Sequence, residues 1–142
     1  MAPRIKHIAL SCPDPAKTAA FYKEVFGMEE LRRQPQDTGD EGVWLTDGYI
    51  YFAVLKHGSH EAPILDDGST ATPGVHHIGF YVDDIDKATD AIEAAEATEC
   101  DVSTKANRKY KGPEGVMIDL RVKGWDEQIR NKTQLYKLTP AS

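Results

Sequence analysis

The chain lacks the long apolar run that a membrane helix needs. None of its hydrophobic stretches approaches the roughly 20 residues that cross a bilayer, and the first ten residues, MAPRIKHIAL, contain neither the apolar core nor the cleavage site of a signal peptide. Only two cysteines, Cys12 and Cys100, occur among 142 residues, which excludes the disulfide framework of small secreted domains. We therefore expect a cytoplasmic protein with reduced thiols.

An excess of basic residues is absent as well. Lys and Arg number 17 against 23 Asp and Glu, so the formal net charge is −6. Nucleic-acid binding needs a basic surface that neutralises phosphates, and we expect neither nucleic acid nor a membrane as a partner. One local exception is KANRKYK at 105–111, with four basic residues in seven. This segment is either a solvated loop or a grip for an anionic small molecule.

The chain does contain an internal duplication. The segment HIALSCPDPAKTAAFY begins at His7, and HIGFYVDDIDKATDAI begins at His77, at a constant offset of 70 residues. Each copy has the pattern of a strand, a turn and a helix, and the aspartates Asp14 and Asp84 are good N-cap residues. We expect the first helix at 15–26, because a proline opens it and a glycine follows it.

A hairpin follows each helix in the sequence pattern. Residues 42–55 have an Asp-Gly turn, and residues 109–122 turn at Gly-Pro-Glu-Gly. Each strand–helix–three-strand copy is too small to bury its own face, so both combine into a single α+β domain with the helices outside a curved sheet. The expected organisation within 1–142 is module one at 4–56, a connector at 57–74, module two at 75–123 and a C-terminal tail at 124–142.

Alternation along the strand that contains both adjacent histidines separates them. It places two sets on opposite faces, namely His77, Gly79 and Tyr81 on one, and Ile78, Phe80 and Val82 on the other. His76 falls with the apolar set or in solvent. The first copy repeats the pattern with His7 on the face lined by small residues, which is typical of a cavity wall.

A third polar residue lies in the last strand of module two. In GVMIDLRV the apolar residues alternate, and Asp119 lies on the opposite face together with Arg121. A carboxylate among branched apolar residues is costly unless it is paired or binds a cation. Two imidazoles and one carboxylate, from His7, His77 and Asp119, match a divalent-metal site with open positions. The alternative is that the histidines are structural and that Asp119 pairs with Arg121 or with Lys123.

The chain resembles the vicinal oxygen chelate superfamily, which contains glyoxalase I, bleomycin-resistance proteins, methylmalonyl-CoA epimerase and extradiol dioxygenases. The resemblance covers about 4–123, through KHIAL, DPAKTAAFYKEVFGM, HHIGFYVDDID and GPEGVMIDL. It implies two tandem βαβββ modules whose mixed sheet curls, barrel-like, around a metal-containing cavity, commonly in a homodimer. It also implies metal ligands at His7, His77 and Asp119. Matching Gly48 with Gly115 places the fourth ligand position of the family at Phe52, or at Tyr51 if the match is shifted by one residue.

Two departures from the family pattern concern the metal. The last ligand is usually Glu rather than Asp, and a phenylalanine cannot ligate. The resemblance implies a metal-dependent enzyme of the glyoxalase-like lyase or isomerase type, which chelates vicinal oxygens of a small metabolite on Fe, Mn, Zn, Ni or Co. The alternatives are a dioxygenase on the same site, a drug-binding protein like the bleomycin-resistance members, and a structural domain with a decayed site. We expect the substrate to contact Trp44, Phe52, Tyr81, Arg108, Lys109 and Tyr110.

Overall fold

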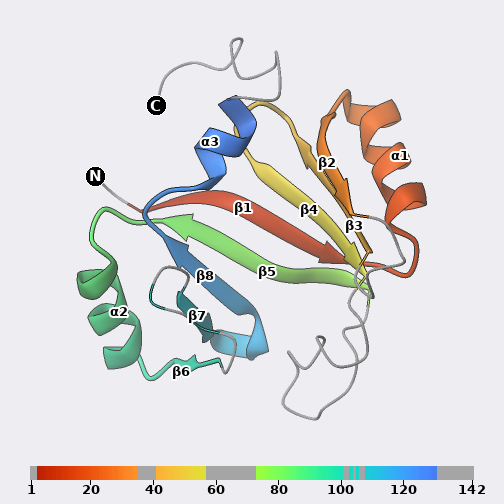
Figure 1. Cartoon of the computed structure of the whole chain (residues 1–142). Helices are drawn as coiled ribbons and strands as arrows, with labels where there is room; N and C mark the ends of the chain where they lie inside the picture. The colour runs from red at the N-terminus through yellow and green to blue at the C-terminus, as the bar shows by residue number, and fades with distance from the viewer. Residues whose placement is uncertain are drawn as a thin grey trace.

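The fold is an eight-stranded mixed sheet that curls without closing, with its two longer helices on the outer side (Figure 1). The computed structural model describes residues 3–34, 41–56, 73–100, 103, 105 and 108–130. The strands are β1 Arg4–Ser11, β2 Glu29–Gln34, β3 Glu41–Thr46, β4 Tyr51–Lys56, β5 Gly74–Tyr81, β6 Thr98–Glu99, β7 Arg108–Lys111 and β8 Met117–Arg121. The helices are α1 Pro15–Phe26, α2 Ile85–Ala94 and α3 Trp125–Arg130, with a 3-10 turn at Pro113–Gly115.

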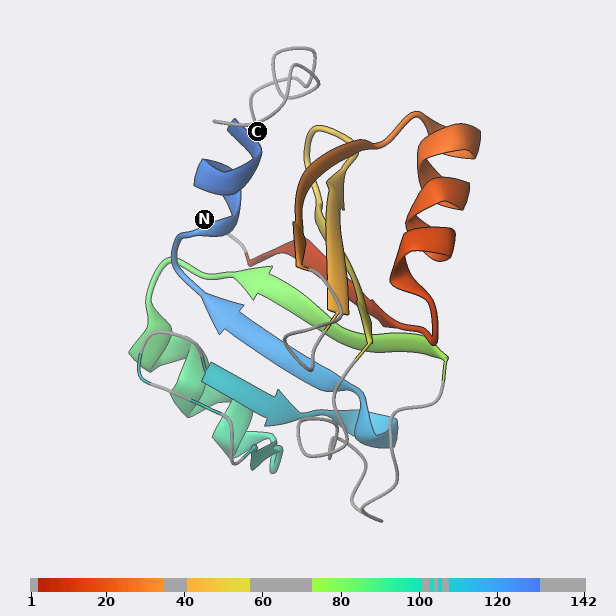
Figure 2. The same ribbon diagram turned by 45° about the vertical axis from the view of Figure 1, so that its right-hand side comes forward.

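The two copies of the duplicated unit meet at the middle of the sheet, whose strand order is β2-β3-β4-β1-β5-β8-β7-β6. Strands β1 and β5 pair antiparallel, and Ile8 lies opposite its own counterpart Ile78. The local two-fold relation between the modules therefore passes through this pair. As a result, the equivalent residues His7 and His77 lie one position to either side of it, on the inner face. Figure 2 shows the two halves curling toward each other from this central pair.

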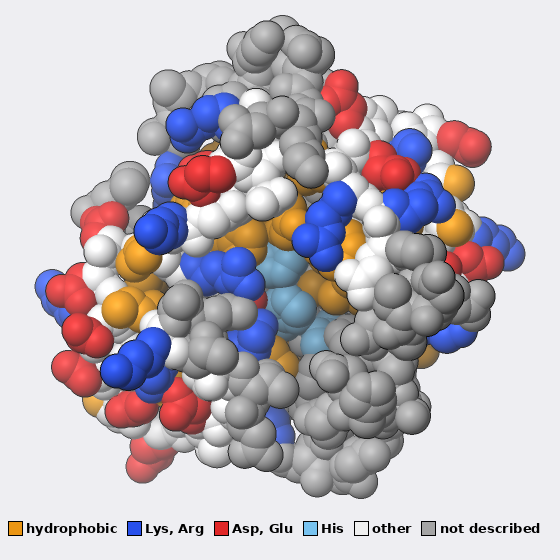
Figure 3. All heavy atoms as spheres, in the orientation of Figure 1, with side chains coloured by type: hydrophobic (Ala, Val, Ile, Leu, Met, Phe, Trp, Pro, Cys, Tyr) orange, Lys and Arg blue, Asp and Glu red, His pale blue; other side chains and the backbone are white. Residues whose placement is uncertain are grey.

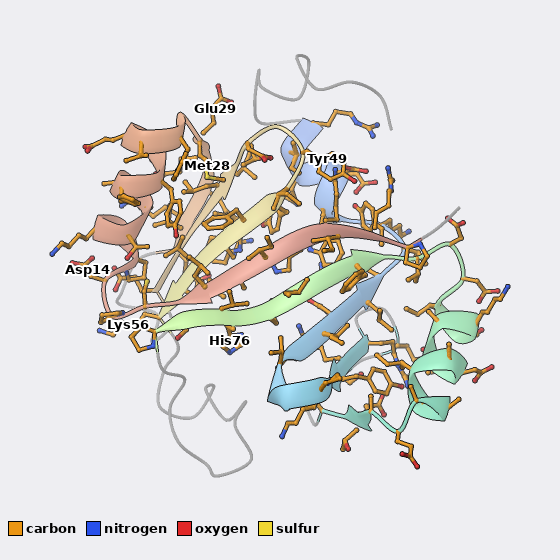
Figure 4. All side chains as sticks on the ribbon, turned by 180° about the vertical axis from the view of Figure 1, so that it is seen from behind. Asp14, Met28, Glu29, Tyr49, Lys56 and His76 are labelled. Carbon is orange, nitrogen blue, oxygen red and sulfur yellow. The ribbon has the colours of Figure 1, made fainter. Side chains whose placement is uncertain are left out.

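The outer side of each module is covered by its own helix, as the sequence predicts. Asp14 accepts a hydrogen bond from the backbone of Lys17 at the start of α1, and Gly27, with φ of 68°, ends that helix (Figure 4). Asp84 caps α2 in the same way. Helix α1 buries Ala19 against β3 and β4, while α2 packs on the outer residues of β5, β7 and β8. The helices therefore leave the inner face of the sheet to a cavity.

Both expected hairpins are confirmed. Asp47 accepts from the backbone N–H groups of Tyr49 and Ile50 in the β3–β4 turn, and the 3-10 turn links β7 to β8. The expected connector lies outside the described residues up to position 72, and the tail lies outside them from position 131. Within the described ranges, no helix is long and apolar enough to cross a membrane.

Candidate metal site and cavity

Two imidazoles face each other across the central strand pair. The Nε2 atoms of His7 and His77 are 2.9 Å apart, and both side chains are buried. The duplicated sequence produces this arrangement because Ile8 and Ile78 pair directly, so the histidine before each isoleucine projects from the same face toward the same point.

The tautomer of His7 is set by the neighbouring strand. Its Nδ1 lies 2.6 Å from the carbonyl oxygen of Tyr51, and a carbonyl can only accept, so Nδ1 carries the proton and Nε2 offers a lone pair. Burial lowers the pKa of His7 to about 4, although the Tyr51 carbonyl and the charge of Asp119 partly oppose the shift. The imidazole is therefore neutral at physiological pH, in the form that binds a metal.

The third group is the carboxylate of Asp119, whose exposed fraction is 1%. Its Oδ2 lies 3.9 Å from Nε2 of His77 and 3.0 Å from Nζ of Lys109. Its Oδ1 is buried without a hydrogen-bond partner among the described residues. The ammonium group of Lys109 therefore pairs with one carboxylate oxygen, and the other oxygen can still accept a hydrogen bond or bind a cation.

These three residues fit a divalent cation. One ligand atom from each of His7, His77 and Asp119 lies within 4.8 Å of the others, and all three residues are buried. The lone pair of His7 points at the second imidazole, and Oδ2 of the Asp119 carboxylate lies 3.9 Å from Nε2 of that imidazole. A cation between these atoms would satisfy all three, and the two-His-one-carboxylate set is one that Fe, Mn and related ions accept.

The trio lies in a cavity of about 400 Å³ on the inner face of the sheet. Figure 3 shows histidine side chains at the floor of a hollow that is rimmed by Lys and Arg. Four charged residues line the cavity besides the histidines, and three of them are cations: Arg32, Lys109, Arg121 and Asp119. A cavity of this size and charge suits a small anionic molecule.

His76 does not lie in solvent or with the outward apolar set, as alternation predicted. The β1–β5 register pairs Ala9 with His77 but Leu10 with Val75, so His76 is the extra residue of a β-bulge. It is buried, and its Nδ1 lies 2.6 Å from Nδ1 of His77. Figure 4 shows His76 on β5 near the start of the strand. The bulge therefore makes the two adjacent histidines direct neighbours.

The contact between His76 and His77 allows a test of whether His76 orients the His77 ring for metal binding. When Nε2 of His77 offers its lone pair to a cation, its Nδ1 carries the proton and donates to His76, so His76→Phe removes the acceptor. Loss of such outer partners typically lowers metal affinity about 10–100-fold. We expect calorimetric titration with Co²⁺ or Zn²⁺ to show a loss of metal affinity of this size, while the far-UV circular dichroism spectrum stays unchanged. Equal affinity in the two proteins would show that His76 does not position its neighbour.

Sequence reasoning left the role of the C-terminal tail open between a dimer contact and a cavity cover. In the structure, Trp125 of helix α3 closes one end of the cavity. Its ring stacks on His7 at 5.2 Å between centroids and on Tyr81 at 5.1 Å. The helix is held by a 2.6 Å ion pair between Asp126 and the buried Lys6. The apolar pair Trp125 and Ile129, spaced by four residues and buried in the structure, was the available signal.

Phe52 neither lines the cavity nor occupies the fourth-ligand position. Asp119 pairs with Gly79 in β5–β8, and the corresponding pair in β4–β1 is Ala53 with Ala9. Ala53 is therefore the counterpart of Asp119. The two hairpins differ by one residue between the turn glycine and this position, and a slip of one residue reverses the face of a strand. Phe52 points outward and packs on Tyr22 of α1, with ring centroids 5.0 Å apart. Alanine at the counterpart position cannot ligate either.

The other expected substrate contacts divide by the face of the sheet on which they lie. Trp44 and Lys109 line the cavity. Tyr110 is completely buried under α2, where its hydroxyl donates to Glu93, and Arg108 beside it pairs with a glutamate of β6. Tyr81 lies on the inner side, but it is buried beneath the α3 tryptophan and accepts a hydrogen bond from the backbone of that helix. Arg108, Tyr110 and Tyr81 are therefore not among the cavity-lining residues.

Comparison with known proteins identifies the family. The model of the Glyoxalase/Bleomycin resistance protein/Dioxygenase superfamily matches residues 4–120. The chain belongs to this superfamily. The ethylmalonyl-CoA/methylmalonyl-CoA epimerase of Cereibacter sphaeroides is 32% identical over 107 residues, which are 68% of this chain and 74% of that protein. The human mitochondrial methylmalonyl-CoA epimerase is 31% identical over 87 residues, and this match spans 60% of the chain but only about half, 49%, of the human protein.

Solved structures of the superfamily share the fold. A methylmalonyl-CoA epimerase in complex with methylmalonyl-CoA and ammonium superimposes with a TM-score of 0.60 at 23% identity, covering 84% of this chain and 94% of that one. The epimerase from Mycobacterium tuberculosis gives 0.59 at 18% identity, covering 82% and 85%. The expected architecture of two curled modules is confirmed. The similarity to epimerases, which are isomerases, also supports the expectation that this superfamily member is an enzyme.

Proposed function

We propose that the protein is a divalent-metal-dependent enzyme of the isomerase or lyase type that acts on a small anionic acyl metabolite. His7, His77 and Asp119 would hold the ion, and the ion would polarise an acyl oxygen of the substrate. The observation that carries this proposal is the convergence of three buried ligand atoms within 4.8 Å inside a cavity. The sequence relatives, which are epimerases, support the isomerase type over the other chemistries of the superfamily.

A bound divalent ion supplies Lewis-acid stabilisation of the negative charge that develops when a carbon next to a carbonyl loses a proton. The chain contributes the other parts of the site. The Tyr51 carbonyl holds the His7 ring in one tautomer, and Trp125 excludes water from one side of that ring. Lys109, whose Nζ lies 3.0 Å from the carboxylate, attracts the anionic substrate to the same point.

The residues that line the cavity limit which side chain can transfer a proton to or from the substrate. Asp119 is the only acid among the described residues that line the cavity, because its counterpart in module one is Ala53. We therefore assign proton transfer at the substrate carbon to Lys109, which lines the same cavity. For the substrate we propose a malonyl-type acyl thioester, since the sequence relatives are named for ethylmalonyl-CoA and methylmalonyl-CoA.

A ring-cleaving dioxygenase is the second candidate. The observation in its favour is the ligand set itself, because two histidines and one carboxylate with Ala53 in the fourth place match the non-haem iron oxygenases. This reaction requires Fe²⁺ or a similar redox ion, oxygen and a catechol, whereas proton transfer in an isomerase accepts redox-inactive ions such as Zn²⁺.

The test combines metal binding with proton exchange. The protein is stripped of metal, reconstituted separately with Mn²⁺, Co²⁺, Ni²⁺, Zn²⁺ and anaerobic Fe²⁺, and analysed for bound ion. We expect one ion per chain and ion-dependent exchange of deuterium from solvent into C2 of methylmalonyl-CoA, followed by NMR. Oxygen uptake with catechol in the Fe²⁺ form alone would favour the dioxygenase. A trace of metal that does not rise on reconstitution would exclude both candidates.

A further inference from the structure

The cavity carries positive charge beyond what a metal site needs. Three cationic side chains and one carboxylate line it, although the chain as a whole has a net charge of −6. Lys109 is paired with that carboxylate. The two guanidinium groups, from Arg32 of β2 and Arg121 of β8, come from opposite halves of the curled sheet and reach the same cavity. An anion in the cavity would lie between them.

Both guanidinium groups stack on tryptophan. The central carbon of Arg32 lies 3.9 Å from the centroid of the Trp44 ring, and that of Arg121 lies 5.0 Å from the Trp125 ring. Stacking on an aromatic face restrains a guanidinium, and the five N–H donors in its plane can serve more than one partner. Arg32, for example, donates to Gln34 through Nη2 at 3.5 Å. A restrained guanidinium binds a carboxylate through two parallel hydrogen bonds with less loss of side-chain entropy. The two Arg–Trp pairs therefore form a preorganised anion site.

Tyr51 lines the same cavity as the two arginines. A phenol hydroxyl can donate a hydrogen bond to an anion. The lining therefore offers one neutral donor besides the two guanidinium groups.

This anion site is adjacent to the metal ligands but separate from them. Arg121 follows Asp119 by two residues on the same inner face of β8, and residues two apart in a strand are displaced by about 7 Å. One anionic group of a substrate at the trio and another at the arginines would therefore be joined by a short chain of atoms. A cavity of about 400 Å³ holds such a molecule.

We propose that Arg32, Arg121 and the Tyr51 hydroxyl bind a second anionic group of the substrate, a carboxylate. The substrate class is then a short dicarboxylic metabolite or its acyl derivative, with an oxygen of one carboxyl or acyl group at His7, His77 and Asp119 and the free carboxylate at the arginines. The part of this inference that concerns the trio rests on the proposed function. The carboxylate subsite itself requires no metal.

The two tryptophans of the chain make the test direct. Both line the cavity beside the arginines, and the sequence contains no others, so tryptophan fluorescence reports on this site. The wild-type protein is titrated with succinate, propanoate and inorganic phosphate, without metal and with spectroscopically silent Zn²⁺. Calorimetry of the same titrations gives the affinities independently of fluorescence, because the substitutions can change the tryptophan emission of the unliganded protein.

The matched variants are Arg32→Gln and Arg33→Gln. Arg33 is the next residue of β2, and both side chains are exposed. Arg33 does not line the cavity and binds Glu30, with the nearer N–O distance 2.7 Å. Each variant removes one equal charge. In the Zn²⁺ form we expect succinate to bind at least tenfold more tightly than propanoate, and Arg32→Gln or Arg121→Gln to abolish that preference. Without metal, Arg32→Gln should weaken succinate binding at least tenfold and Arg33→Gln less than twofold.

Equal losses in Arg32→Gln and Arg33→Gln would overturn the subsite, because only general charge would then matter. Arginine-dependent binding of phosphate without binding of succinate would overturn its assignment to a carboxylate. Failure to take up Zn²⁺, with the arginine-dependent binding of succinate intact, would contradict the proposed function and leave the subsite. Stoichiometric Zn²⁺ with no arginine-dependent binding would contradict the subsite alone.

Discussion

Asp119→Asn should cost the protein its divalent ion and its activity. The amide has nearly the shape of the carboxylate, but it has no charge to offer a cation and leaves Lys109 without the partner it holds at 3.0 Å. Loss of an outer-shell partner already lowers metal affinity about 10–100-fold, and Asp119 is one of three direct ligand candidates with 1% exposure. We expect the affinity to fall by more than about 100-fold.

The measurement is thermal unfolding with and without the ion. An ion present at 100 times its dissociation constant adds about 2.7 kcal/mol to the unfolding free energy of a protein that binds it only when folded. The wild-type protein should show this gain, and Asp119→Asn should show at most about 0.4 kcal/mol at the same concentration. Asp90→Asn, which removes one exposed charge from α2, is the control and should keep the full gain. A full gain in Asp119→Asn would place the ion elsewhere or require other ligands.

Gly79→Ala should damage the fold and the metal site together. Gly79 lies in β5 between His7 on one neighbouring strand and Asp119 on the other. A Cβ atom there would lie 2.7 Å from Cβ of His7 and 2.6 Å from Cη2 of Trp125, distances that require neighbours to move. His7 Cβ is fixed by the backbone, so the tryptophan or the strand has to shift. Overpacking of this kind typically costs about 1–3 kcal/mol, and it displaces a candidate ligand.

A double-mutant cycle identifies the cause. Trp125→Leu removes the ring atoms nearest to the new methyl group, so the double variant should be less destabilised than the sum of the two single variants by about 1 kcal/mol. Chemical denaturation gives the unfolding free energies, and calorimetry with Zn²⁺ gives the metal affinity of each protein. Additive effects on stability, or unchanged affinity in Gly79→Ala, would show that α3 and the central strands do not share this contact.

The local signals in the sequence predicted the elements well, because each depends on neighbours along the chain. An aspartate before a helix and a glycine after it act on backbone groups within one turn of the helix end, and α1 begins and ends where they indicate. The duplication that begins at His7 and His77 is also present in the structure, where the equivalent strands pair with each other. Since equivalent strands meet at the centre of the sheet, equivalent residues converge there, and a repeat in the sequence becomes a pair of facing imidazoles.

The errors arose where one residue was gained or lost between strands. The bulge at His76 and the extra residue before Ala53 each change the face of a side chain. Neither leaves a periodic signal, since a bulge is defined only by the partner strand. The same limit applies to Arg108 and Tyr110, because alternation separates the faces of β7 but does not say which face α2 covers.

The sequence by itself determined the two-module α+β fold, the helix ends, the hairpins and the three residues that meet at the candidate metal site. These depend on hydrophobic periodicity, capping and repetition, which are short-range properties of the chain. Only the tertiary structure decided the placement of Trp125 over His7, the contact between the adjacent histidines and the placement of Arg32, Arg121 and Tyr51 on one cavity. Those contacts depend on strand register and on how far the sheet curls, and both are set by packing between segments that are distant in sequence.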